Sequence, residues 1–141
     1  MCALPIASVM ETMRPLPVQR LENAPALVLG LAMVRGVPTP VIDTARLLGA
    51  ENAGAVGRFI TLAIGTRVVA LAVATVWGVR SVPPQSMQAM PPLLTQAEGH
   101  AVAAIGALDQ ELLVLLQGAR LIPAAILTAA HTSAVAEVNA R

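Results

Sequence analysis

The sequence predicts a mainly β protein built from two related β units. Apolar and β-branched residues fill two runs, 59–64 and 67–73, separated by a Gly-Thr turn, which is the pattern of a β-hairpin. A second pair of apolar runs flanks Arg35-Gly36, where glycine can adopt the positive φ of a tight turn. The two halves also share short stretches of similar sequence in the same order.

The predicted elements follow in order from a strand at 3–10. After it we expect an extended loop at 15–17, a hairpin at 26–43, a helical turn at 44–48, a hairpin at 58–76 prolonged by 77–80, an exposed loop at 81–92, strands at 102–108 and 111–116, a helical turn at 119–122 and a helix at 124–140. Pro38 and Pro40 lack an N–H, so their strand should lie at a sheet edge or start there. Asp43 precedes a helical turn and is predicted to be its N-cap.

Internal similarity carries the prediction of two units. Residues 41–48 resemble 115–122, each a strand followed by Ala-Arg-Leu, and Gly30 precedes its turn as Gly106 precedes the second one. By this comparison the strand at 4–9 has no hairpin partner. We therefore expect that the chain lacks about one strand and a turn, leaving unpaired backbone groups.

Length and composition point to a soluble protein of one domain, or of two small lobes that share a core, with an unusually apolar surface or a large partner interface. The 141 residues are 56% hydrophobic and 12% charged, with a net charge of +1 and a mean hydropathy of +0.72. The longest apolar run, 68–79, is too short to cross a membrane, which takes about 20 residues. No signal peptide is recognised, and the single Cys2 fits a cytoplasmic location.

Several function classes are disfavoured by what the sequence lacks. All nine basic residues are arginines scattered along the chain, and Phe59 and Trp77 are the aromatic residues, so a nucleic-acid surface is not indicated. His100 and His131 have no acidic or cysteine neighbours at ligand spacing, so no metal site is expected. No nucleotide or nucleophile fingerprint is present, so we expect no catalytic residue and no cofactor.

An ordered set of short motifs spans about Leu4 to Leu121. The set comprises Val9-Met10-Glu11, Ala24-Pro25-Ala26, Gly30, Arg35-Gly36, Pro40-Val41-Ile42-Asp43, Gly65-Thr66-Arg67 and Gly106-Ala107-Leu108-Asp109. Together these motifs resemble the CheW-like domain of bacterial chemotaxis.

The resemblance implies two SH3-like five-stranded β-barrels packed around a shared core. The first would span about 1–56 and be incomplete at its N-terminus, the second about 57–122, with a C-terminal helix at about 123–140. Members of this family are non-enzymatic adaptors that couple the histidine kinase CheA to methyl-accepting chemoreceptors. The resemblance thus implies two partners, a receptor tip in the groove between the barrels and the kinase regulatory domain, and a membrane association only through receptors.

The resemblance also assigns a partner-binding surface. Its predicted residues are Val9, Glu11, Gly30, Arg35 and Gly36, with Glu11 placed to pair with Arg35. The chain departs from the family pattern where Met33 replaces a usual Asn and Gln117 replaces a frequent acidic residue.

An alternative from a different class is a small β-barrel enzyme or a lipid-binding or ligand-binding domain. Its site would combine Glu11, Arg35 and Asp43 with a histidine. Of the remaining candidates, Trp77 is predicted to lie in the core, and Asp109 and Glu111 to be solvated turn residues. Met87 and Met90 are interpreted as loop residues, although methionine also suits adaptable binding surfaces.

Overall fold

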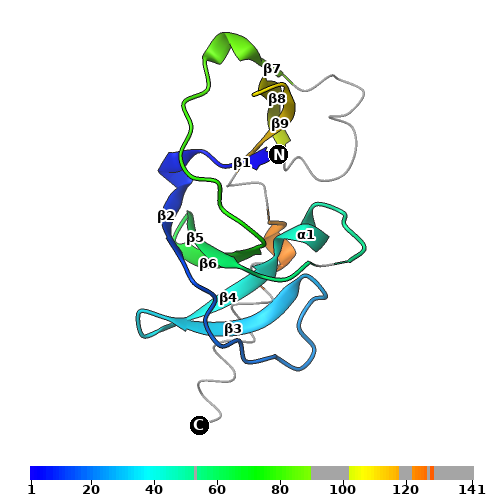
Figure 1. Cartoon of the computed structure of the whole chain (residues 1–141). Coiled ribbons are helices and arrows are strands. Elements are labelled where there is room, and N and C mark those ends of the chain that lie inside the picture. Colours follow the sequence, from blue (N-terminus) through cyan, green and yellow to red (C-terminus); the bar gives the residue numbers. More distant parts are fainter. Residues whose placement is uncertain (53, 90–101, 118–121, 127, 129–141) are drawn as a thin grey trace.

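A computed structural model describes residues 1–52, 54–89, 102–117, 122–126 and 128, and it is mainly β as predicted (Figure 1). Its elements are β1 (Cys2–Ala3), η1 (Ile6–Ser8), β2 (Val9–Met13), β3 (Val28–Val34), β4 (Val37–Asp43), α1 (Thr44–Leu47), β5 (Arg58–Ile64), β6 (Arg67–Val73), η2 (Pro84–Ser86), β7 (Met87–Ala89), β8 (Val102–Leu108) and β9 (Glu111–Leu116). Residues 124–126 and 128 are helical.

The larger sheet has five strands in the order β2-β5-β6-β4-β3. The hairpin predicted at 58–76 forms β5 and β6, which pair from Arg58 with Val73 to Ile64 with Arg67. The hairpin around Arg35-Gly36 forms β3 and β4. Both turns therefore lie where the turn residues of the sequence predict them.

The prolines were predicted to mark a sheet edge or the start of a strand. The sheet edge is wrong for β4, because this strand lies between β3 and β6, whereas Pro38 is the second residue of β4 (Val37–Asp43). The parallel contact with β6 begins only at Val41. Pro38 and Pro40 lie before it and pair with β3 alone. Their missing N–H groups therefore leave the contact between β4 and β6 complete.

A short bridge connects the two ends of the larger sheet. Gln19, which follows edge strand β2, exchanges two backbone hydrogen bonds of 2.8 Å with Leu31 of the opposite edge strand β3. Gly30 makes this approach possible, because a Cβ there would overlap the Gln19 carbonyl oxygen and lie 2.7 Å from its carbonyl carbon. The bridge links the chain after one edge strand of the sheet to the other edge strand, and the glycine permits this link.

The smaller sheet has the order β1-β9-β8-β7 in the described residues. The strands predicted at 102–108 and 111–116 form β8 and β9. The N-terminal β1 adds to β9 in parallel, with Cys2 opposite Val114. Gly106 of β8 lies against the preceding segment, since a Cβ there would stand 2.7 Å from the Ser86 oxygen. Each of the two hairpins thus contains a glycine against which an earlier segment of the chain packs.

The sheets do not follow the barrel boundary predicted near residue 56. Strands β5 and β6 come after that residue, yet β5 pairs with β2 and β6 pairs with β4. The N-terminal β1 instead joins the smaller sheet. The chain therefore crosses between the two sheets more than once, and neither sheet is built from one contiguous half.

The single strand predicted at 3–10 is wrong. Pro5 interrupts it, and the 3-10 turn η1 separates β1 from β2. The expectation that this region has unpaired backbone groups is also wrong, because β1 pairs with β9 and β2 pairs with β5, both of which lie far away in the sequence.

The segment between the sheets also differs from prediction. Residues 74–82 form no strand, and Trp77, predicted to be in the core, is 75% exposed because the chain there leaves β6 to reach the smaller sheet. The predicted loop contains η2 and β7, so Met87 is a strand residue. Met90, most of the helical turn predicted at 119–122 and most of the C-terminal helix lie outside the described residues.

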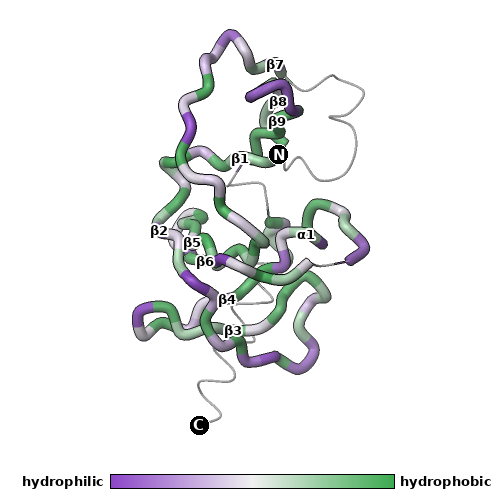
Figure 2. The backbone as a smooth tube through the Cα atoms, viewed as in Figure 1, coloured by the Kyte–Doolittle hydropathy of each residue, from purple (hydrophilic) through white to green (hydrophobic). Residues whose placement is uncertain are grey.

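The core joins both sheets, as the predicted shared core requires. One cluster packs Leu62, Val69 and Leu71 of the larger sheet against Leu116 of β9 and against Ile122. A second cluster surrounds Phe59. Figure 2 shows hydrophobic residues along the strands of both sheets and hydrophilic residues at turns, including the turn between β3 and β4.

Candidate functional site

An exposed ion pair joins β2 to the turn between β3 and β4. The Arg35 Nη2 lies 2.6 Å from Glu11 Oε2, and the Arg35 Nε lies 2.9 Å from Glu11 Oε1. The contact is thus bidentate, which fixes the direction of the guanidinium. The arginine side chain is 79% exposed and the glutamate side chain 27%. The predicted pairing of Glu11 with Arg35 is therefore present in the structure.

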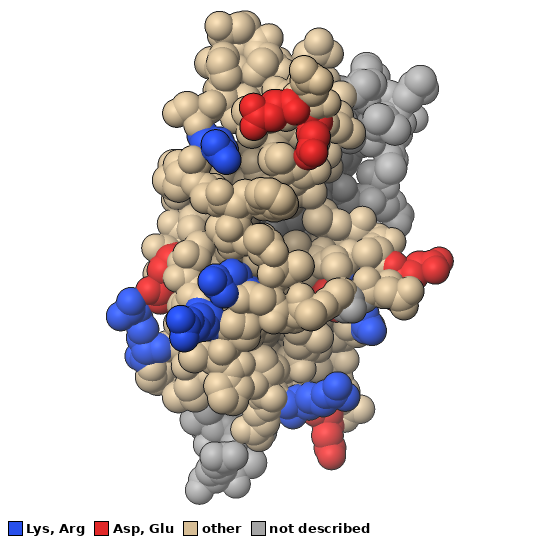
Figure 3. All heavy atoms as spheres, viewed as in Figure 1, with Lys and Arg blue, Asp and Glu red and all other residues tan. Residues whose placement is uncertain are grey.

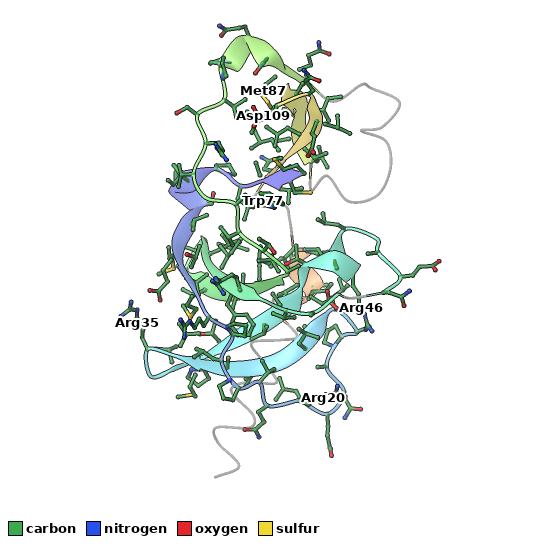
Figure 4. The ribbon with its side chains drawn as sticks, in the orientation of Figure 1. Arg20, Arg35, Arg46, Trp77, Met87 and Asp109 are labelled. Carbon is green, nitrogen blue, oxygen red and sulfur yellow. The ribbon has the colours of Figure 1, made fainter. Side chains whose placement is uncertain are left out.

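The local backbone explains why the arginine projects from the turn. Arg35 has φ 49° and Gly36 has φ 78°, so both central residues are left-handed. Two such residues form a tight turn whose twist matches that of the flanking strands. The structure therefore places Arg35 at the tip of the β3–β4 hairpin (Figure 4), next to Gly36 in the turn and paired with Glu11 of β2.

The ion pair shifts the pKa values of both side chains. The hydrogen bond from Arg35 lowers the pKa of Glu11 below its usual 4.5, and the Coulombic attraction of Arg35 adds to this effect. The hydrogen bond to Glu11 and its charge raise the pKa of Arg35 above its ordinary value. Both groups are consequently ionised throughout the neutral pH range.

The pair is expected to persist until the pH falls below the ordinary pKa of glutamate. A lowered folded-state pKa means that the stabilisation is complete above pH 4.5 and is lost as the pH falls through the Glu11 pKa. An NMR titration of the Glu11 side-chain carboxyl should give a midpoint below 4.5, and Arg35→Met should move it up. An unchanged midpoint in that variant would contradict the pairing in solution.

Two exposed apolar residues lie in the strands on either side of the turn that carries Arg35. Met33 on β3 is 60% exposed and Val37 on β4 is 59% exposed. Sequence reasoning did not assign them to the surface site, although Met33 was noted as a departure from the family pattern. The signal was available, because both adjoin a tight turn in which side chains are normally solvated.

The other two predicted site residues lie elsewhere. Gly30 packs directly against the backbone of Gln19. Val9 is partly buried, packs against the core cluster that contains Leu62 and faces the space between the sheets. The structure therefore gives both residues structural contacts.

An apolar cleft of about 780 Å³ lies between the two sheets. Val9, Met10 and Ile60 line it from the larger sheet, and Leu113 and Leu115 from the smaller sheet. Figure 4 shows Trp77, which also lines the cleft, between the two sheets. Sequence reasoning missed this residue because it was predicted to be buried.

Asp43, proposed for the enzyme alternative, is remote from this pair. Its Oδ1 accepts a hydrogen bond of 3.2 Å from the Arg46 N–H, and its Oδ2 lies 3.4 Å from Arg46 Nε, which confirms the predicted N-cap. Arg35 and Arg46 lie at opposite ends of the hairpin strands (Figure 4). His100 and His131 lie outside the described residues.

The face of the molecule seen in Figure 3 carries few charges. Figure 3 shows acidic and basic side chains in small groups separated by large uncharged areas. Asp109 lies in the turn between β8 and β9, as predicted, with φ 53°. Within the described ranges we find no group of three potential metal ligands. No helix there has the length and hydrophobicity of a membrane span.

Comparisons with known proteins agree on one family. A family model described as the CheW-like domain matches residues 1–125. A probable chemotaxis protein CheW from Rhizobium etli is 29% identical over 114 residues, which are 79% of this chain and 74% of that protein. The crystal structure of scaffolding protein TtCheW from Thermoanaerobacter tengcongensis superposes with a TM-score of 0.72 at 24% identity, over 81% of this chain and 79% of that one. The last comparison supports the fold.

Proposed function

The chain belongs to the CheW-like domain family, and we propose that it is a cytoplasmic, non-enzymatic adaptor that couples methyl-accepting chemoreceptors to the regulatory domain of the histidine kinase CheA. The observation that carries the proposal is the family match over residues 1–125. The names of the two relatives, a chemotaxis protein and a scaffolding protein, support it.

We assign the receptor contact to the surface around Arg35. Its Nε and Nη2 are directed at Glu11, while in the described residues Nη1 has no hydrogen-bond partner. The exposed Met33 and Val37, on the strands next to the turn, supply apolar area for the same partner. A charge near exposed apolar side chains suits a specific protein contact, because the polar group sets orientation and the apolar area adds affinity.

Glu11 acts in this proposal by positioning the arginine. Its bidentate contact holds the guanidinium before the partner arrives, so less side-chain freedom is lost on binding. Gly36 contributes through the turn that presents Arg35. Val9 and Gly30 contribute by holding β2 and β3 in place.

Arg35→Glu is expected to weaken binding to a receptor cytoplasmic fragment about tenfold or more, because it reverses the charge at the contact. Isothermal titration calorimetry would measure the affinity. The melting temperature should change little, since the side chain is 79% exposed. A loss of folding would show that Arg35 is structural.

The matched control is Arg20→Glu, which makes the same charge change at an exposed position far from Arg35 (Figure 4). This variant should bind the fragment like the wild type. The adaptor proposal fails if the wild-type chain binds neither the receptor fragment nor the CheA regulatory domain at micromolar concentration.

A further inference from the structure

Two arginines lie next to each other at one end of the ladder between β2 and β5. The pairing of these antiparallel strands ends with Met13 opposite Phe59. One residue further along, the same register places Arg14 opposite Arg58, the first residue of β5. Both arginines are exposed. Figure 3 shows basic side chains gathered over the part of the molecule where β2 and β5 lie side by side.

The two positive charges are uncompensated. Side chains opposite each other on neighbouring strands have Cβ atoms about 4.5–5.5 Å apart, and like charges at such positions destabilise a sheet. Within the described part of the chain, the carboxylates that form ion pairs bind other arginines. The fold therefore retains an unfavourable pair of cations that a bound anion would stabilise.

The acidic residue of β2 does not relieve this repulsion. Side chains alternate along a strand, so Glu11 lies on the opposite face of β2 from Arg14. Its carboxylate is also already engaged by Arg35. The guanidinium of Arg58 donates through Nη1 to the Gly57 carbonyl at 2.8 Å, and among the described residues it has no other hydrogen bond. Its remaining N–H groups are thus available to a ligand.

This pair of arginines is separate from the cleft between the sheets. Thr12 and Ile60, which are paired on the same face two residues away, line the cleft. Arg14 and Arg58 do not line it. They form a charged surface beyond one end of the cleft, on the larger sheet alone.

We propose that Arg14 and Arg58 together bind a phosphate monoester. Such a group carries a charge of about −1.5 to −2 at pH 7 and has three acceptor oxygens. One group can therefore neutralise both guanidinium groups and accept hydrogen bonds from each. This site is additional to the adaptor function and requires neither a receptor nor a kinase.

The charge of the pair favours a phosphate monoester over two other anions. A single carboxylate has one negative charge and would leave one arginine uncompensated. Nucleic acid carries one charge per phosphate and needs a basic surface that follows its backbone. Figure 3 shows basic side chains in small groups rather than in a continuous track.

Isothermal titration calorimetry of the full chain with inorganic phosphate and with O-phospho-L-serine, at constant ionic strength, tests the proposal. Both should bind the wild type. Arg14→Gln and Arg58→Gln should each raise the Kd about tenfold or more, because each removes one charged donor. Arg20→Gln is the matched control, since it removes the same charge from an exposed position elsewhere (Figure 4). It should leave the Kd unchanged.

Thermal unfolding followed by circular dichroism gives an independent readout. Without phosphate and at low ionic strength, Arg14→Gln should raise the melting temperature by about 1–4 °C, because it removes the repulsion from Arg58. Phosphate should raise the melting temperature of the wild type by binding to the folded state, and that of Arg14→Gln much less. A lower melting temperature of Arg14→Gln in the absence of phosphate would overturn the proposal, since it would make Arg14 a structural residue.

A phosphoserine peptide distinguishes the two sources of a phosphate monoester. Tighter binding of the peptide than of free O-phospho-L-serine supports a phosphorylated protein as the ligand, and equal binding supports a small phosphate ester. The proposal is overturned if sodium chloride at equal ionic strength has the same effects as phosphate. It is also overturned if Arg20→Gln weakens binding as much as Arg14→Gln, or if the peptide with glutamate in place of phosphoserine binds equally well.

Discussion

Gly30→Ala is expected to lower the free energy of unfolding by about 3–5 kcal/mol, the sum of backbone strain and two lost hydrogen bonds. Gly30 has φ 145°, and a Cβ there would overlap the Gln19 oxygen. The bridge between Gln19 and Leu31 must then open. Urea denaturation followed by circular dichroism would measure the change.

Gly36→Ala is the matched control for this variant. Gly36 also has a positive φ, of 78°, but a Cβ there would meet nothing within 4 Å. Gly36→Ala should lower the free energy of unfolding by about 1 kcal/mol, because it adds backbone strain and no steric overlap. Equal losses at both positions would contradict the importance of the bridge.

Phe59→Ala is expected to lower the free energy of unfolding by about 3–5 kcal/mol, the upper range for truncation of a core side chain. The ring is 2% exposed, and its cluster contains the small residues Ala32, Ala70 and Ala72. Alanines cannot move into the space that the ring leaves, so the cavity should remain open. The free energy of unfolding, again from urea denaturation, is the quantity to compare.

Trp77→Ala provides the contrast, because it removes the other aromatic residue of the chain from a position that is 75% exposed. Stability should change by no more than about 0.5 kcal/mol. Phe59→Leu, which keeps most of the volume, should lose less than Phe59→Ala. The explanation fails if Phe59→Ala and Trp77→Ala destabilise the protein equally.

Much of the candidate site could be predicted from local patterns. The hairpin turn needs residues that accept a positive φ, which Arg35-Gly36 reveals in the sequence. Family resemblance then supplied the pairing of Arg35 with Glu11, which the structure confirms. The exposure of Trp77 was not predicted, because a lone tryptophan in an apolar run is usually buried. Its position in the segment between the two sheets exposes it.

The sequence by itself determined the β hairpins, the turn that presents Arg35, and the Asp43 cap. Each depends on neighbouring residues, because turn chemistry, side-chain alternation and capping act over a few positions. Only the tertiary structure decided which strands share a sheet. The pairing of β5 with β2, the addition of β1 to β9 and the bridge at Gly30 join segments far apart in the chain. Such pairings follow from burial of apolar faces against one another, which apolar composition permits in many arrangements.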